Sequence, residues 1–143
     1  MSQLQSEGNP LRKVRLLSVV FLIYAIALPT ITLLIPESDL PTITSPSLLS
    51  WVMILLMPFE MILIYMFYRI FVSKPKFTSI IGPGVLLYMV ATIPSIYAMI
   101  IGFTDVYMRL IAIPLGLMFS LVGLWLASIF IPKIWDASQS EVP

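Results

Sequence analysis

One carboxylate lies in the middle of a very apolar stretch of this sequence. The segment LLMPFEMILIYMF, residues 55–67, contains Glu60 as its one charged residue. A carboxylic acid in such surroundings has three uses. It forms hydrogen bonds between helices in its neutral state, it pairs with a basic residue or cofactor of another subunit, or it takes up and releases a proton or cation. To weigh these three hypotheses, we need to know which elements surround Glu60.

The composition indicates that those elements lie in a membrane. Of the 143 residues, 59% are hydrophobic and only 10% are charged, and the mean hydropathy is +1.03. Soluble domains carry about 25% charged residues. We therefore expect the lipid bilayer to be the main surrounding of the chain. The net charge of +1 gives no basic field, so we expect no nucleic-acid partner.

The sequence contains no cysteine and no histidine. Disulfides, thiolate metal sites and histidine-ligated haem are therefore excluded. The chain therefore also lacks the two side chains that most often act as nucleophile or general base, cysteine and histidine. We expect no catalytic residues, no metal site and no cofactor, and we expect the protein not to be an enzyme.

Four apolar segments are each long enough to cross a bilayer as a helix. They cover residues 13–35, 48–72, 79–102 and 108–131. The sequence therefore predicts an all-α membrane protein with four transmembrane helices in a bundle. We expect one transmembrane domain over residues 1–143, with short polar tails at 1–10 and 134–143. Ser45 before Pro46 is the expected N-cap of the second span, and Thr104 or Asp105 that of the fourth.

The basic residues predict the orientation of the spans. Seven of the eight fall on one side of the predicted membrane: Arg12, Lys13, Arg15, Arg69, Lys74, Lys76 and Lys133. Arg109 alone falls on the other side. Because basic loops stay on the cytoplasmic side, we expect a multi-pass protein of the cell membrane with both termini cytoplasmic.

Two rows of small residues predict how the third and fourth spans meet. The first row is Ala91, Ser95, Ala98 and Gly102, and the second is Gly116, Ser120, Gly123 and Ala127. Steps of three and four place each row on one helix face. Small side chains let two helices approach closely in lipid. We expect these spans to form a tightly packed antiparallel hairpin, although another subunit is an alternative partner for either row.

Each span also contains one proline: Pro29, Pro58, Pro94 or Pro114. A proline lacks an N–H, frees a carbonyl about one turn earlier and tends to kink the helix. Pro29, for example, frees the carbonyl of Ala25. One interpretation is that these kinks open an internal cavity or act as hinges. The alternative is that membrane helices simply tolerate proline.

Glu60 lies 12 residues from either end of the 48–72 span, near the predicted bilayer centre. At a similar depth the other spans offer Tyr24, Thr92 and Ser120. They offer no basic residue there. Since a charge at this depth is costly, we expect Glu60 to be mostly neutral and to share a polar intramembrane site with these hydroxyls.

The leading hypothesis for function is a small non-enzymatic integral membrane subunit or accessory protein of a larger membrane complex. It is favoured by the lack of a soluble domain and of a catalytic constellation. Other membrane subunits are then the expected partners. The alternative is a homo-oligomeric proton- or cation-coupled carrier or channel in which Glu60 titrates.

Overall fold

The structure, a computed structural model, describes residues 10–40, 45–74 and 79–140, and its regular elements there are all helical. The elements are α1 (Pro10–Ile31), the short 3-10 helices η1 (Thr32–Leu34) and η2 (Glu37–Asp39), α2 (Leu48–Leu56), α3 (Phe59–Ser73), α4 (Ile81–Thr104) and α5 (Val106–Ser140). Within these ranges, four helical segments are long and apolar enough to cross a membrane. The prediction of four helices long and apolar enough to cross a membrane is confirmed.

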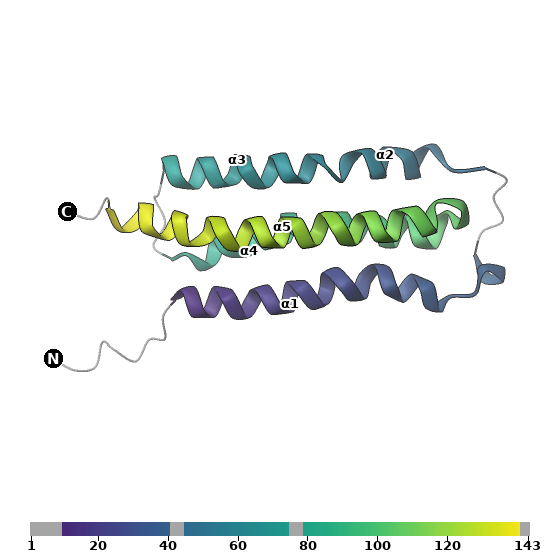
Figure 1. Ribbon diagram of the computed structural model, residues 1–143, viewed down its shortest axis with the longest axis horizontal. Coiled ribbons are helices and arrows are strands. Elements are labelled where there is room, and N and C mark those ends of the chain that lie inside the picture. Colours follow the sequence, from purple (N-terminus) through teal and green to yellow (C-terminus); the bar gives the residue numbers. More distant parts are fainter. Residues whose placement is uncertain (1–9, 41–44, 75–78, 141–143) are drawn as a thin grey trace.

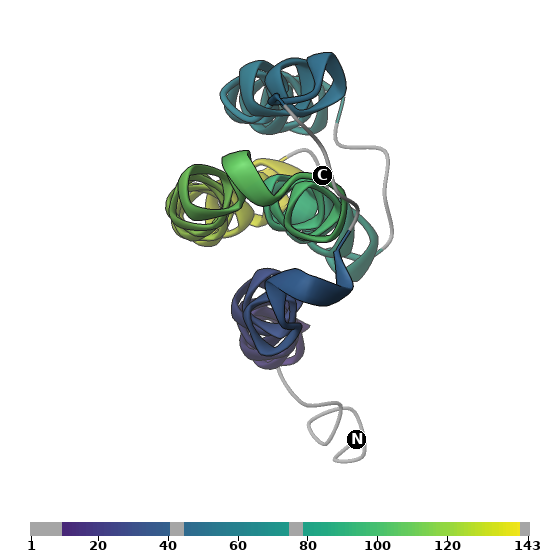
Figure 2. The same cartoon turned by 90° about the vertical axis from the view of Figure 1, so that its right-hand side faces the viewer.

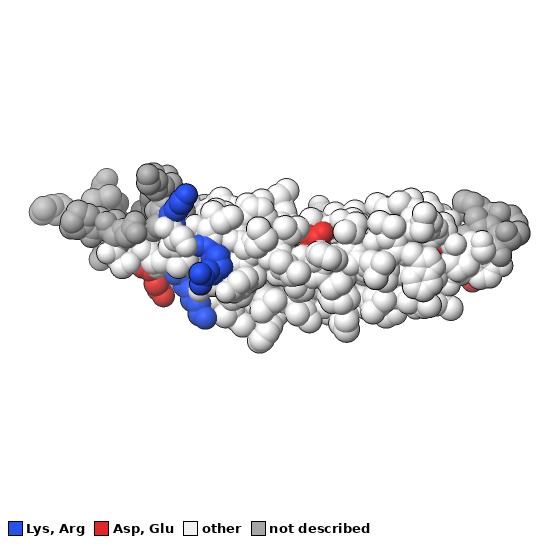
Figure 3. Space-filling view, turned by 90° about the horizontal axis from the view of Figure 1, so that it is seen from above, with Lys and Arg blue, Asp and Glu red and all other residues white. Residues whose placement is uncertain are grey.

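The helices form three layers rather than a square bundle. Helices α4 and α5 make a central antiparallel pair, with α1 on one side and the α2–α3 segment on the other (Figure 1; Figure 2). The start of α1 and the end of α5 lie at the same end of the molecule (Figure 1). Lysine and arginine side chains gather at this end, which we call the basic end (Figure 3). The opposite end, where α4 turns into α5, is the distal end.

The layered arrangement makes α4 the centre of the molecule. Of its most apolar 18-residue window, 56% is buried, against 39% for α5, 22% for α2–α3 and 17% for α1. Helix α4 meets α1, α3 and α5, whereas each outer layer packs on one side only. The outer layers therefore present long apolar faces to their surroundings.

The central pair approaches closely because small residues face each other. A Cβ atom added at Gly116 would lie 2.7 Å from the carbonyl oxygen of Pro94 and would also meet Ala98. One added at Gly123 would lie 3.1 Å from the Cβ of Ala91. These contacts place the two rows of small residues against each other in the middle of α4 and α5.

Two glycines of α4 make their closest contacts with α1 and η1. Gly102, which the sequence grouped with the row facing the fourth span, lies against Thr32: an added Cβ would be 2.5 Å from its Oγ1. Gly84 lies against Val14, with an added Cβ 2.7 Å from the valine Cγ1. The row at Gly102 turns away from α5 because η1 folds over that end of α4.

The four prolines have different effects on the helices that contain them. Pro58 separates α2 from α3, and the Met57 N–H before it is shared between the carbonyls of Met53 and Ile54, at 3.2 and 3.3 Å. Pro29, Pro94 and Pro114 lie inside helices that continue past them.

Helix α5 continues past residue 131 to Ser140, so residues 134–140 of the predicted polar tail are helical. Ile131 and Ile134 are buried there, together with Val14 of α1 and Ile80 just before α4. The apolar run ends in the sequence at Lys133, but one face of the helix still has a core to pack on. The other predicted tail residues, 1–9 and 141–143, lie outside the described residues.

Candidate functional site

Glu60 occupies the first turn of α3, directly after the interruption at Pro58. Its side chain is buried, with 5% of the residue exposed. The Tyr97 hydroxyl of α4 donates a hydrogen bond to Glu60 Oε1 at 3.3 Å. The other carboxyl oxygen, Oε2, is buried and has no hydrogen-bond partner among the described residues. Glu60 is thus a polar link between α3 and α4 in which only one of the two carboxyl oxygens has a hydrogen-bond partner among the described residues.

The three hydroxyls that the sequence grouped with Glu60 lie elsewhere. Tyr24 is 57% exposed on α1, on the far side of the central pair from α3 (Figure 2). The Thr92 hydroxyl donates to the Met89 carbonyl of its own helix at 2.8 Å. Tyr24 and Thr92 line an apolar groove of about 520 Å³ between α1 and α4. Equal depth in the membrane does not bring them to Glu60 because they lie on other faces of the layered structure.

Ser120, the third hydroxyl, belongs to a buried polar node that joins three helices. The Ser95 hydroxyl of α4 donates to the Ala25 carbonyl of α1 at 2.8 Å, and Ser95 Oγ lies 2.8 Å from Ser120 Oγ of α5. Ser120 Oγ also accepts the Ser95 backbone N–H at 3.0 Å. Since Pro29 frees the Ala25 carbonyl, the node satisfies a backbone group that α1 itself cannot.

The tyrosine that does meet Glu60 was not identified from the sequence. Tyr97 lies closer to the distal end of its span than the residues matched by depth, and its long side chain spans the difference. The signal that would have found it is helix adjacency, because α3 packs on α4 and α5 but lies across the central pair from α1.

A second buried carboxylate, at the distal end, forms hydrogen bonds to both α2 and α5. Asp105 is fully buried and accepts hydrogen bonds from Ser50 Oγ at 2.7 Å, from the Ser47 N–H at 2.8 Å and from the Met108 N–H at 3.1 Å. Burial alone raises the pKa of Asp105, but these hydrogen bonds outweigh burial and hold the pKa below its ordinary value. Asp105 therefore joins the start of α5 to the start of α2.

The N-cap of α2 lies two residues after the one that the sequence predicts. Ser47, not Ser45, is the N-cap of α2, and its Oγ accepts the Ser50 N–H at 3.1 Å. Ser47 stays extended, with φ −74° and ψ 146°, because its own N–H is held by Asp105. The prediction of Ser45 was wrong because it could not include this tertiary contact.

Arg109 is buried one turn further along α5, with 5% of the residue exposed. Its Nη1 and Nη2 atoms both donate to the Ile35 carbonyl, at 3.1 and 3.2 Å. Its Nε is buried and has no hydrogen-bond partner among the described residues. The guanidinium therefore fixes the end of η1 to the start of α5, which is a structural use of the one basic residue at this end.

These sites offer hydrogen bonding rather than metal chemistry in the part of the chain that the structure describes. No group of three or more Asp, Glu, His or Cys side chains comes together there. Among the four segments of that part that are long and apolar enough to cross a membrane, Glu60 is the one carboxylate that lies far from both ends. The sequence matches no protein-family model, no curated protein and no solved structure, so Glu60 and its surroundings are interpreted from their own geometry.

Proposed function

We propose that this chain is a small, non-enzymatic integral membrane subunit or accessory protein of a larger membrane complex. We further propose that it lies in the cell membrane with both termini cytoplasmic. The gathering of lysine and arginine side chains at the basic end supports that orientation, since basic ends stay on the cytoplasmic side (Figure 3).

The observation that carries the proposal is the exposed face of the α2–α3 segment. Six bulky side chains on this face are between 50% and 64% exposed. They are Trp51, Leu55, Phe59, Ile62, Met66 and Ile70, and we call them the outer stripe. Their spacing of three or four residues continues through the interruption at Pro58. A partner helix would find here a continuous surface of large side chains along most of the membrane thickness.

The layered fold supports the same function. The α4–α5 pair and α1 are joined by small residues and by the Ser95 node, so they form one closely packed unit. The α2–α3 segment covers one side of this unit and leaves its own outer side free. Such a unit presents that outer side to a partner.

Purification of the tagged chain from its native membrane in mild detergent tests the proposal. We expect stoichiometric co-purification of at least one other polypeptide. Replacing Leu55 and Ile62 of the outer stripe by alanine should reduce that polypeptide several-fold. Alanine at Val19 and Ile23, which are exposed on α1, is the matched control and should leave it unchanged. A monodisperse homo-oligomer of this chain alone would contradict the proposal.

The unpartnered oxygen of Glu60 favours a second candidate, a homo-oligomeric proton- or cation-coupled carrier or channel. A buried carboxyl with a free oxygen has the capacity to bind a proton or cation. Flux of protons or monovalent cations into liposomes tests this candidate. Glu60→Gln keeps the size of the side chain and loses its titration. Flux that is the same in wild type and variant would remove Glu60 from any transport mechanism.

A further inference from the structure

An apolar groove of about 520 Å³ lies between α1 and α4. Three residues of α1 and six of α4 line it, and of these only Tyr24 and Thr92 have a polar side chain. The Thr92 hydroxyl donates to the Met89 carbonyl of its own helix at 2.8 Å, so this hydroxyl is already used. The side chains around the groove therefore offer an occupant apolar contacts and a single hydroxyl, that of Tyr24.

The groove is open along its rim and closed at its floor. Tyr24, Met89 and Ile96 are exposed at the rim, whereas Val90 and Thr92 are buried. In a membrane, exposed apolar side chains of this kind lie against lipid. The groove is thus a space that molecules of the bilayer enter from the side, without passing through the protein.

The width of the groove decides what kind of molecule fits. On α4 the groove extends from Leu86 to Ile96, about 15 Å at the rise of an α-helix, so its mean cross-section is about 35 Å². A transmembrane helix is about 10–12 Å across and needs roughly 80 Å² or more. A hydrocarbon chain in van der Waals contact is about 4–5 Å across and needs about 20 Å². The groove is therefore wide enough for a hydrocarbon chain and too narrow for a partner helix.

The depth of the groove matches the inner part of an acyl chain. On α1 it extends from Phe21 to Leu28, about 9 to 20 Å along the helix axis from Arg15, the last basic residue of the basic end on this helix. One leaflet contributes about half of the ~30 Å hydrocarbon core, so a chain that starts at the level of Arg15 reaches this depth.

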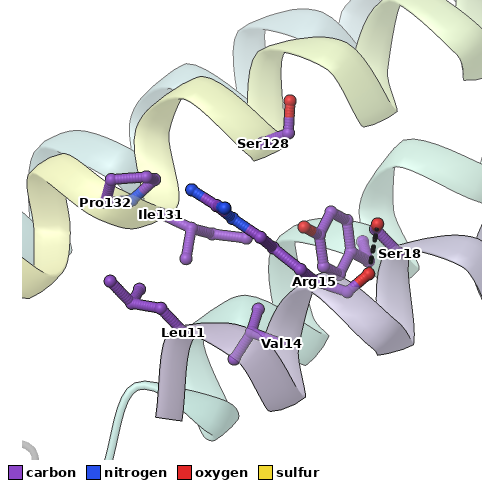
Figure 4. A pocket seen from close by; sticks show the side chains of 8 residues that line it. Leu11, Val14, Arg15, Ser18, Ser128, Ile131 and Pro132 are labelled. Atoms are coloured by element: carbon purple, nitrogen blue, oxygen red, sulfur yellow. Dashed lines mark hydrogen bonds between the residues drawn. The ribbon is translucent and has the colours of Figure 1, made fainter. Parts of the chain in front are cut away.

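The chain rather than the headgroup is the part of a lipid that the groove contacts. None of the described residues that line it is charged. Arg15 is turned away from it: Figure 4 shows the Arg15 side chain extending across the space between α1 and α5, beside a small pocket whose Ser18 hydroxyl donates to the Arg15 carbonyl at 2.7 Å. A bound lipid is therefore selected by the length of its chain and not by the charge of its headgroup.

We propose that the groove between α1 and α4 binds one acyl chain of a phospholipid from the leaflet at the basic end. The chain enters past Phe21, lies against the buried Val90 and Thr92, and ends near Leu28 and Ile96. Dispersion contacts with both helices hold it there. This site is separate from the interface proposed for the outer stripe, because α1 and the α2–α3 segment lie on opposite sides of the central pair (Figure 2).

Native mass spectrometry of the full chain in neutral detergent tests this proposal. The chain is titrated with dioleoylphosphatidylcholine, with dioleoylphosphatidylglycerol and with dioctanoylphosphatidylcholine, whose chains are less than half as long. We expect one dioleoyl lipid to be retained equally well with either headgroup, and the dioctanoyl lipid to be retained far less. Preference for one of the two dioleoyl headgroups, or equal retention of the dioctanoyl lipid, would overturn the proposal.

Ile96→Trp and Met89→Trp place a large ring at the rim of the groove. Each should weaken retention of the dioleoyl lipids at least about fivefold, the equivalent of one or two buried methylene groups, and should reduce the preference for long chains. Leu121→Trp is the matched control, because Leu121 is an exposed residue of α5 that does not line the groove. Circular dichroism of each variant verifies that the helices are retained. Equal losses in the control and in the groove variants would mean unspecific lipid contact and would overturn the proposal.

Tyr24→Phe separates a hydrocarbon chain from a ligand with a polar group inside the groove. It removes the one available hydroxyl of the lining and keeps the ring. Retention of the dioleoyl lipids should be unchanged, since an acyl chain has no acceptor at this depth. A several-fold loss would instead mean that the occupant accepts a hydrogen bond from Tyr24, and a co-purifying polypeptide that is lost in Ile96→Trp would mean a protein partner. Either result would overturn the proposal.

Discussion

The Ser95 hydroxyl donates a 2.8 Å hydrogen bond to the Ala25 carbonyl, the backbone acceptor that Pro29 deprives of its helical partner. The hydrogen bond of Ser95 in α4 thus compensates for the one that Pro29 removes from α1. Ala25 and Ser95 are both fully buried, so neither group has water as an alternative partner. The carbonyl that Pro29 leaves without a partner in α1 therefore accepts a hydrogen bond that links α1 to α4.

Ser95→Ala should lower the free energy of unfolding by about 1–2 kcal/mol, because it leaves the Ala25 carbonyl buried and unpaired. In a Pro29→Ala background the loss should be at least about 0.5 kcal/mol smaller, because the new N–H at position 29 can satisfy that carbonyl. Unfolding in mixed micelles followed by circular dichroism measures all four proteins of the cycle. Ser73→Ala, an exposed serine of α3, is the control. Additive effects would show that Ser95 and Pro29 act independently.

Gly116→Ala should destabilise the fold by about 1–3 kcal/mol, because the new methyl group meets the Pro94 carbonyl and Ala98. Gly123→Ala should cost less, since the contacts at 3.1 Å include the flexible ends of Ile64 and Met61. Thermal unfolding in detergent gives the ranking. Gly82→Ala is the control, since nothing lies within 4 Å of its added Cβ. Wild-type stability in the Gly116 variant would contradict close packing of α4 on α5.

The sequence predicted the spans well and their ends less well. Hydropathy and length locate an apolar helix within a few residues, because lipid leaves no other way to satisfy the backbone. They do not predict where the helix ends once it leaves the lipid. Helix α5 continues beyond Lys133 because Ile134 packs into the core near Val14 and Ile80, and that contact depends on the arrangement of three helices.

The candidate site could likewise be predicted only in part. A single acid in residues 55–67 is visible from composition alone, whereas its partner is not. Depth along straight helices predicts Tyr24, Thr92 and Ser120 as its neighbours. Depth gives only the position of a residue along the helix axis. Its position across the bundle depends on which helices are neighbours and on which face of its helix the residue lies. In the layered order of α1, α4–α5 and α2–α3, Glu60 meets Tyr97, whereas Tyr24, Thr92 and Ser120 make other contacts.

Lowering the pH should weaken the distal end through Asp105. Its pKa in the folded chain is below the ordinary value of 3.8, so its hydrogen bonds add stability that is fully present above that value. That stability is lost as the pH falls through the lower pKa of the folded state. Melting temperatures between about pH 5 and pH 3 should therefore fall more steeply for wild type than for Asp105→Asn.

At neutral pH, Asp105→Asn should itself cost about 1–3 kcal/mol, because one amide oxygen cannot accept all three hydrogen bonds. Asp136→Asn removes the same charge from an exposed position of α5 and should leave the neutral stability unchanged. A pH slope that is equal in wild type and Asp105→Asn would assign the acid sensitivity to other carboxylates.

The pair of Glu60 and Tyr97 should be coupled only weakly. Their hydrogen bond is long, at 3.3 Å, and polar contacts between transmembrane helices are worth about 0.6 kcal/mol on average. A double-mutant cycle of Glu60→Gln and Tyr97→Phe in mixed micelles measures the coupling, with the exposed Tyr107→Phe as the control. Coupling near the average would leave Glu60 free to serve a partner subunit or a transported ion. Coupling above about 2 kcal/mol would instead make the pair a structural clamp between α3 and α4, and both proposed uses of Glu60 would lose their basis.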